Sequence, residues 1–186
     1  MQADYFSEAS KTFDRLAETM PAGLVELRDA ILQTWEEGGK VISFGNGGSA
    51  TDSLHFTTEL VAKFNVKPIQ RPALSLSASP STLTAVSNDW SFEEVFSRQV
   101  KALGNAKDVF VGISTSGNSP NVLRGLKAAL EVGGRTFGLT DAEGGKLQKL
   151  DVELINVPAT RTAHVQEAHI ACLHWVCDQI DRKLNS

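Results

Sequence analysis

Residues 40–49 read KVISFGNGGS and carry the clearest structural signal in this chain. The first five residues form a short apolar run, about as long as a strand buried on both faces. The glycines that follow are typical of a tight loop, and the residues from 49 onward have the apolar spacing of a helix. A second junction of this kind lies at 108–119, DVFVGISTSGNS, after which Pro120 begins another helical pattern. Two strand–loop–helix units of this type predict a parallel α/β sheet.

The same alternation extends over most of the chain. We expect strands at 40–44, 73–77, 108–114, 135–140 and 152–157, and helices at 6–20, 24–37, 49–63, 81–87, 92–103, 120–132 and 163–184. This order predicts a three-layer α/β sandwich, with a five-stranded parallel sheet between two helical layers. We expect one domain over residues 1–186, in which residues 1–38 form a helical appendage that packs against another subunit.

Composition argues against several classes of protein. The 186 residues include 18 Lys and Arg against 22 Asp and Glu, a formal net charge of −4, without a basic cluster. We therefore expect no nucleic-acid partner. No apolar run is long enough to span a bilayer and the first residues lack a signal-peptide pattern, so we expect no membrane association. The only two cysteines, Cys172 and Cys177, are typical of buried thiols in a reducing compartment, which favours a cytoplasmic location.

The loop at 114–119 holds four hydroxyl side chains, those of Ser114, Thr115, Ser116 and Ser119. Loops at the carboxyl ends of parallel strands, followed by helix N-termini, bind phosphate through hydroxyls and backbone N–H groups. The loop therefore indicates a site for a sugar-linked phosphate monoester. A Ser/Thr-rich turn that only caps the next helix, with Ser119 as N-cap, is the simpler alternative.

The loop at 45–49 would face the rest of such a substrate. Asn46 offers an amide there, and Gly47 and Gly48 allow the backbone to approach closely. The spacing Gly45-x-Gly47-x-x-Ala50 also matches the dinucleotide fingerprint, but the acidic residue expected about 20 positions later is missing. A nicotinamide cofactor is therefore disfavoured.

Two further pairs of side chains are chemically suggestive. His55 and Glu59 lie four positions apart on a predicted helix and share one face, although an ordinary surface pair has the same spacing. On the last helix, His169 falls on the apolar stripe and is expected in the core, whereas His174 lies off it. Gln166 and His174 would be about 12 Å apart along a regular helix. Either Gln166 precedes that helix, or a site that uses both residues combines two chains.

Together these residues resemble a known family. The motifs are Gly45-Asn-Gly-Gly-Ser49, His55-Phe-x-x-Glu59, Asn88-Asp89, Phe96-Ser-Arg98, Gly112-Ile-Ser-Thr-Ser-Gly-Asn-Ser119 and Gln166-Glu-x-His-x-x-x-x-His174. They resemble the phosphoheptose isomerases, which are sugar isomerase (SIS) domain proteins with a flavodoxin-like sheet. The resemblance covers essentially the whole chain. It implies isomerisation of sedoheptulose 7-phosphate to D-glycero-D-manno-heptose 7-phosphate, the first step of activated-heptose synthesis.

The resemblance also implies a homotetramer with active sites between subunits and one zinc ion per subunit. Its implied zinc ligands are His55, Glu59, Gln166 and His174. Its implied substrate-binding residues are Asn46, Gly47, Gly48, Ser49, Glu59, Asn88, Asp89, Ser114, Thr115, Ser116, Ser119 and Gln166. Because ketose–aldose exchange through an enediol needs a base at carbon and an acid at oxygen, Glu59 is the candidate base and His174 the candidate acid.

This sequence departs from the resemblance at His164 and Lys63, where many relatives have Arg. These departures affect the identity of the sugar phosphate more than the class of reaction. The alternative to an enzyme is a non-catalytic SIS module, either a factor that binds a replication initiator or a sugar-phosphate sensor. Such modules would be free to lose the carboxylate or the imidazole, whereas this chain keeps both Glu59 and His174.

Overall fold

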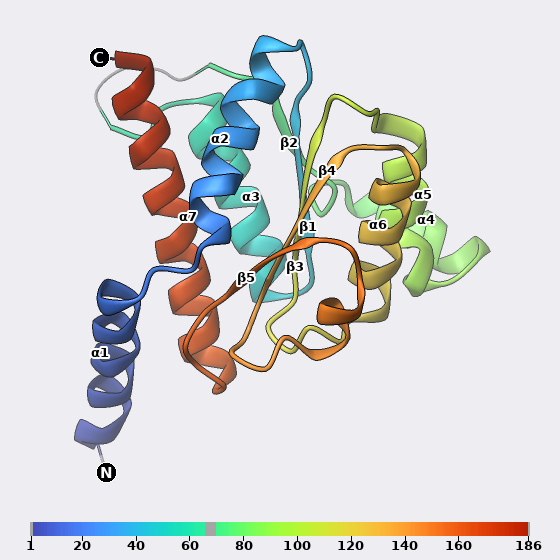
Figure 1. Cartoon of the computed structure of the whole chain (residues 1–186). Coiled ribbons are helices and arrows are strands. Elements are labelled where there is room, and N and C mark those ends of the chain that lie inside the picture. The colour runs from blue at the N-terminus through green and yellow to red at the C-terminus, as the bar shows by residue number, and fades with distance from the viewer. Residues whose placement is uncertain (1, 66–69, 186) are drawn as a thin grey trace.

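The computed structural model describes residues 2–65 and 70–185 and has a sheet of five parallel strands at its centre (Figure 1). The strand order is β2-β1-β3-β4-β5. The strands are β1 (Val41–Gly45), β2 (Ala73–Ser75), β3 (Val109–Ile113), β4 (Arg135–Thr140) and β5 (Glu153–Asn156). This is the flavodoxin-like order, so the expected five-stranded parallel sheet is confirmed.

Two helical layers cover the sheet. The helices are α1 (Gln2–Glu18), α2 (Gly23–Glu36), α3 (Gly48–Val61), α4 (Pro80–Asp89), α5 (Val95–Leu103), α6 (Pro120–Glu131) and α7 (Thr162–Asn185). In Figure 1, α2, α3 and α7 lie on one side of the sheet and α4, α5 and α6 on the other. The three-layer sandwich is therefore confirmed.

The buried strands divide the core between the two layers. Every residue of β1 and β3 is buried. Val41 and Val109 pack in the cluster that includes α2, α3 and α7, whereas Ile42 and Phe110 pack in the cluster that includes α5 and α6. Because successive side chains of a strand point to opposite faces, a continuous apolar run serves both layers.

The second helix corrects the expectation that residues 1–38 form an appendage. Leu24, Leu27 and Ile31 of α2 are at most 2% exposed and belong to the same core cluster as the strands and α7. The amphipathic face of α2 is therefore buried on the chain's own sheet. Only α1 stands apart from the sandwich in Figure 1, where it contacts α7.

Two local features also differ from expectation. The helix expected at 92–103 begins as a 3₁₀ turn, η1 (Phe92–Glu94), before α5, and a second 3₁₀ turn, η2 (Gly145–Lys149), was not expected at all. Within the described ranges no helix is long and apolar enough to cross a membrane. Cys172 and Cys177 are buried and free, as expected.

Candidate active site

The two loops named by the sequence lie side by side at one edge of the sheet. Gly45 of β1 and Ile113 of β3 are register partners, so the loops that follow them leave adjacent strands at their carboxyl ends. Gly47 has a φ of +53° and is the N-cap of α3, a conformation that glycine adopts without strain. The glycine loop and the Ser/Thr loop therefore meet where ligands bind in open parallel sheets.

The Ser/Thr loop is arranged around Ser114. The Ser114 side chain is buried, and its hydroxyl lies 2.9 Å from the hydroxyl of Ser119. Ser119 is the N-cap residue of α6, as expected, but its side chain makes no capping hydrogen bond. Thr115 is half-buried and Ser116 exposed. Ser116 Oγ accepts the N–H of Asn118, and Ser114 Oγ accepts the N–H of Ser119, so two of these hydroxyls also hold the turn that leads into α6.

The glycine loop is in close contact with the first turns of α7. A Cβ at Gly48 would lie only 2.8 Å from Cδ of Gln166. Gly48 therefore leaves room for the Gln166 carboxamide beside the loop. Gln166 lies inside α7, so the possibility that it precedes the helix is excluded.

A second cluster lies further along α3 and α7. His55 Nε2 is 3.0 Å from Glu59 Oε1 and 3.4 Å from His174 Nε2. Burial and the neighbouring His55 lower the pKa of His174, while Glu59 opposes that shift. The pair expected from the His55/Glu59 spacing is therefore present, and α7 adds His174 to it.

Helix geometry separates this cluster from the loops of the same chain. Glu59 lies eleven residues after Gly48 on α3, roughly 16 Å along the axis. His174 lies eight residues after Gln166 on α7, roughly 12 Å along the axis. One chain therefore brings together Gly48 with Gln166, and His55 with Glu59 and His174, but as two separate groups.

Asn88 and Asp89 lie at the end of α4. They are exposed at the last turn of α4 and hydrogen-bond to each other at 2.8 Å. Ser79 caps the start of that helix by accepting the N–H of Thr82. Ten residues of helix separate the two ends by roughly 15 Å. Asn88 and Asp89 are therefore remote from the helix end that follows β2.

The donor types in the α3/α7 cluster suit zinc, although a complete metal site is not formed. Two imidazoles and a carboxylate are a frequent ligand set of catalytic zinc. Among residues 2–65 and 70–185, no three His, Cys, Asp or Glu side chains are arranged to hold a metal ion. Both close contacts of the cluster meet at His55 Nε2. The three side chains are therefore of the right chemical kind for zinc, but they are not arranged around a common point.

Two polar residues near the loops were missed by sequence reasoning. Burial raises the pKa of Asp52 on α3 to about 6, and its buried Oδ2 has no partner among the described residues. Asn121, in the first turn of α6, is 2% exposed and exchanges two hydrogen bonds with Asn46. An Asn directly after Ser119-Pro120 looks like an ordinary helix-start residue, so no local pattern pointed to the pairing.

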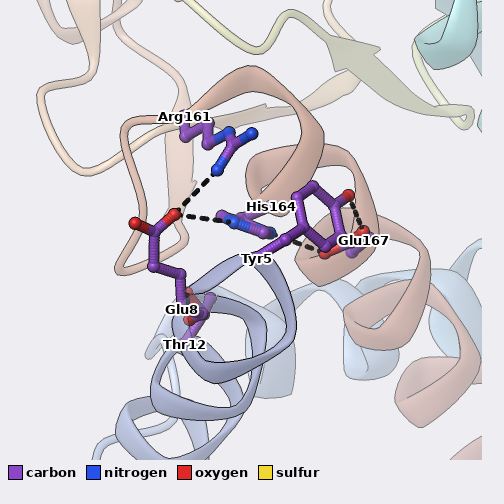
Figure 2. Close-up of polar contacts among 6 residues, drawn as sticks. All are labelled: Tyr5, Glu8, Thr12, Arg161, His164 and Glu167. Atoms are coloured by element: carbon purple, nitrogen blue, oxygen red, sulfur yellow. Dashed lines mark hydrogen bonds and ion pairs between the residues drawn. The ribbon is translucent and has the colours of Figure 1, made fainter. Parts of the chain in front are cut away.

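Helix α1 docks on the beginning of α7 through a polar cluster (Figure 2). The Tyr5 hydroxyl donates to Glu167, whose other carboxylate oxygen is 2.9 Å from His164 Nδ1. Glu8 lies 3.3 Å from His164 Nε2 and accepts from Arg161 at 2.8 Å. Hydrogen bonds from His164 and Tyr5 lower the pKa of Glu167. His164, one of the two departures from the resemblance, thus serves as the buried centre of the α1–α7 contact.

The fold and loops define the class to which this chain belongs. The model of the SIS domain family matches residues 4–141. A phosphoheptose isomerase of Trichlorobacter lovleyi is 42% identical over 173 residues, which cover 92% of this chain and 88% of the relative. One from Neisseria meningitidis is 42% identical over 186 residues, covering 98% and 94%.

A solved structure agrees with these relatives. The phosphoheptose isomerase of Neisseria gonorrhoeae has a TM-score of 0.90 at 41% identity, covering 97% of this chain and 96% of that one. The chain therefore belongs to the SIS domain family and, within it, to the phosphoheptose isomerases.

Proposed function

We propose that this protein interconverts sedoheptulose 7-phosphate and D-glycero-D-manno-heptose 7-phosphate, the first step of activated-heptose synthesis. The observation that carries the proposal is the contact of His174 with the His55/Glu59 pair on α3. A carboxylate and an imidazole supply a candidate base and a candidate acid at one place. Relatives named phosphoheptose isomerase at about 40% identity over nearly the whole chain support the same reaction.

In the proposed reaction, the Glu59 carboxylate removes the proton from C1 of the ketose and returns it to C2. His174 gives a proton to the carbonyl oxygen at C2, and the proton of the C1 hydroxyl is released as the aldose forms. No oxidant or reductant is consumed, because the two carbons exchange oxidation states within one molecule. The phosphate would bind at Ser114, Thr115, Ser116 and Ser119, where hydroxyls and the start of α6 suit an anion.

We propose that His55, Glu59 and His174 hold a zinc ion in the working enzyme. Bound there, zinc would polarise the substrate carbonyl and stabilise the enediolate. Gln166, the remaining candidate ligand, would come from another chain, since it lies about 12 Å along α7 from His174 of its own chain.

The same geometry supports a site shared between subunits of a homotetramer. A heptose phosphate spans less than the roughly 16 Å between Gly48 and Glu59 of one chain. The glycine loop, the Ser/Thr loop and Gln166 of one chain would therefore face the α3/α7 cluster of its neighbour. Asn88 and Asp89, at the end of α4, would likewise contribute to a site on a neighbouring subunit. Two free, buried cysteines support a cytoplasmic setting for this assembly.

The test is turnover of sedoheptulose 7-phosphate, followed by aldose formation. We expect activity in the wild type, loss of at least about a hundredfold in Glu59→Gln and His174→Ala, and loss on chelation that zinc restores. Asp178→Asn, four residues after His174 on α7 and outside both groups, is the control for handling and folding.

The alternative is a protein-binding or sugar-sensing SIS module. A folded oligomer that binds the sugar phosphate but does not turn it over, even with zinc supplied, would establish that alternative and exclude the isomerase.

A further inference from the structure

The amides of Asn46 and Asn121 form a bridge between the two loops. Asn46 Nδ2 donates to Asn121 Oδ1 at 2.8 Å, and Asn121 Nδ2 donates to Asn46 Oδ1 at 2.9 Å. Asn121 Oδ1 also accepts the N–H of Val122 at 2.9 Å. The sequence indicated Asn46 as an amide facing the substrate, but here both ends of that amide are engaged by the protein.

This pair connects the two loops that form the proposed site. Asn46 is the first residue after β1, in the glycine loop. Asn121 lies in the first turn of α6, directly after the Ser/Thr loop. β1 and β3 are neighbours in the sheet, so the pair spans the gap between the two loops at their base. Asn121 is 2% exposed, which makes the loss of either partner costly for the amide left behind.

We propose that Asn121 is a positioning residue for the isomerase, acting through Asn46 to fix the separation of the glycine loop from the Ser/Thr loop. This inference rests on the proposed function. A sugar phosphate that reaches both loops needs them at one spacing, whereas a ligand confined to the Ser/Thr loop does not. Asn121 therefore governs how the sugar end is held relative to the phosphate end, without touching either.

The experiment compares Asn121→Ala, Asn46→Ala and the double variant. We expect each single variant to lose roughly 10- to 100-fold in kcat/KM, because displacements of about 1 Å in a site cost on this scale. The two losses should agree within about threefold, and the double variant should lose no more than either single one. Inorganic phosphate, measured as a competitive inhibitor, should keep its affinity within about twofold in all three variants.

Asn105→Ala is the matched structural control. Asn105 also uses its amide to hold a turn, accepting the N–H of Lys107 at 2.9 Å, but it precedes β3 at the opposite edge of the sheet. This variant should keep wild-type kcat/KM. If Asn121→Ala does not fold, Asn46→Ala breaks the same hydrogen bonds from the less buried residue. The change in kcat/KM can then still be compared with the change in phosphate affinity.

Several results would overturn the inference. A parallel loss of phosphate affinity would make the pair a general support of the Ser/Thr loop. A loss in Asn46→Ala far greater than in Asn121→Ala would mean that Asn46 contacts the substrate directly. Additive losses in the double variant would mean that the two residues act independently. Failure of the proposed function is distinguished by the wild type, which would then show no turnover at all.

Discussion

His169 shows how one buried side chain couples this fold to pH. It is fully buried on α7, and its Nε2 lies 3.1 Å from the carbonyl oxygen of Thr140. Since a carbonyl only accepts, Nε2 carries the proton, and the buried Nδ1 has no partner in the described chain. Burial lowers the pKa of His169 to about 4, which keeps the ring neutral near pH 7.

From this we predict a loss of stability in mild acid. Between pH 6.5 and 4, His169 is protonated in the unfolded chain but stays neutral in the folded chain. The free energy of unfolding therefore falls as the pH falls through that window. The loss should reach roughly 2 kcal/mol by pH 5. His169→Gln retains an amide donor for Thr140 but cannot titrate. The free energy of unfolding, measured with urea at pH 7.5 and pH 5 and at one protein concentration, should fall less for the variant than for the wild type. Equal falls would refute the assignment.

Much of the site could be predicted at this scale, because it depends on local spacing. The His55/Glu59 pair follows from the helical repeat, and the Ser/Thr loop from its composition after a buried strand. The partners of Asn46 and His174 could not be predicted in this way. Asn121 and His55 lie 75 and 119 positions away from them, and only the packing of whole elements brings such residues together.

At the scale of the element, α1 and α2 look alike in sequence but have different roles. Both are amphipathic, and an apolar face does not reveal whether it will meet the chain's own sheet or another surface. α2 packs into the core cluster, whereas α1, among the described residues, adds only the partly buried Leu16 to that cluster. The polar contacts of α1 with α7 are made by Tyr5, Glu8, Arg161, His164 and Glu167. Within that polar cluster the Arg161–Glu8 pair is exposed on both sides, and exposed ion pairs hold an element weakly.

We therefore predict that α1 opens more readily than the rest of the chain. Tyr5→Phe removes the hydroxyl that donates to Glu167 and should increase deuterium uptake across α1 several-fold, with little change in α2. Lys11→Gln, on the same helix but outside this network, is the control. Unchanged uptake in Tyr5→Phe would show that apolar packing alone holds α1 in place.

At the scale of the whole molecule, the proposed shared site predicts rescue between two defective chains. Glu59→Gln disables the α3/α7 cluster, and Ser116→Asp places a negative charge in the phosphate loop. Each variant alone should be inactive. In randomly mixed oligomers, at most about one site in four would combine an intact cluster with an intact loop. Coexpression of differently tagged chains, followed by assay of the mixed species, measures that recovery.

The control for this experiment is a mixture of Glu59→Gln with His174→Ala. Both substitutions lie in the same cluster, so no mixed site would be intact and no activity should return. Recovery in neither mixture would place the whole site within one chain, contrary to the proposal.

The strand order has a consequence for the protein as it is being made. β1 is wholly buried and occupies an inner position of the sheet, yet its neighbour β3 follows it by about 70 residues. At roughly 5–20 residues per second, the ribosome takes several seconds to supply that neighbour. During this interval the nascent chain exposes an apolar segment with unpaired edges, flanked on one side only by the three residues of β2. Newly synthesised chains are thus most vulnerable to aggregation, and most in need of a chaperone, before residue 113 has emerged.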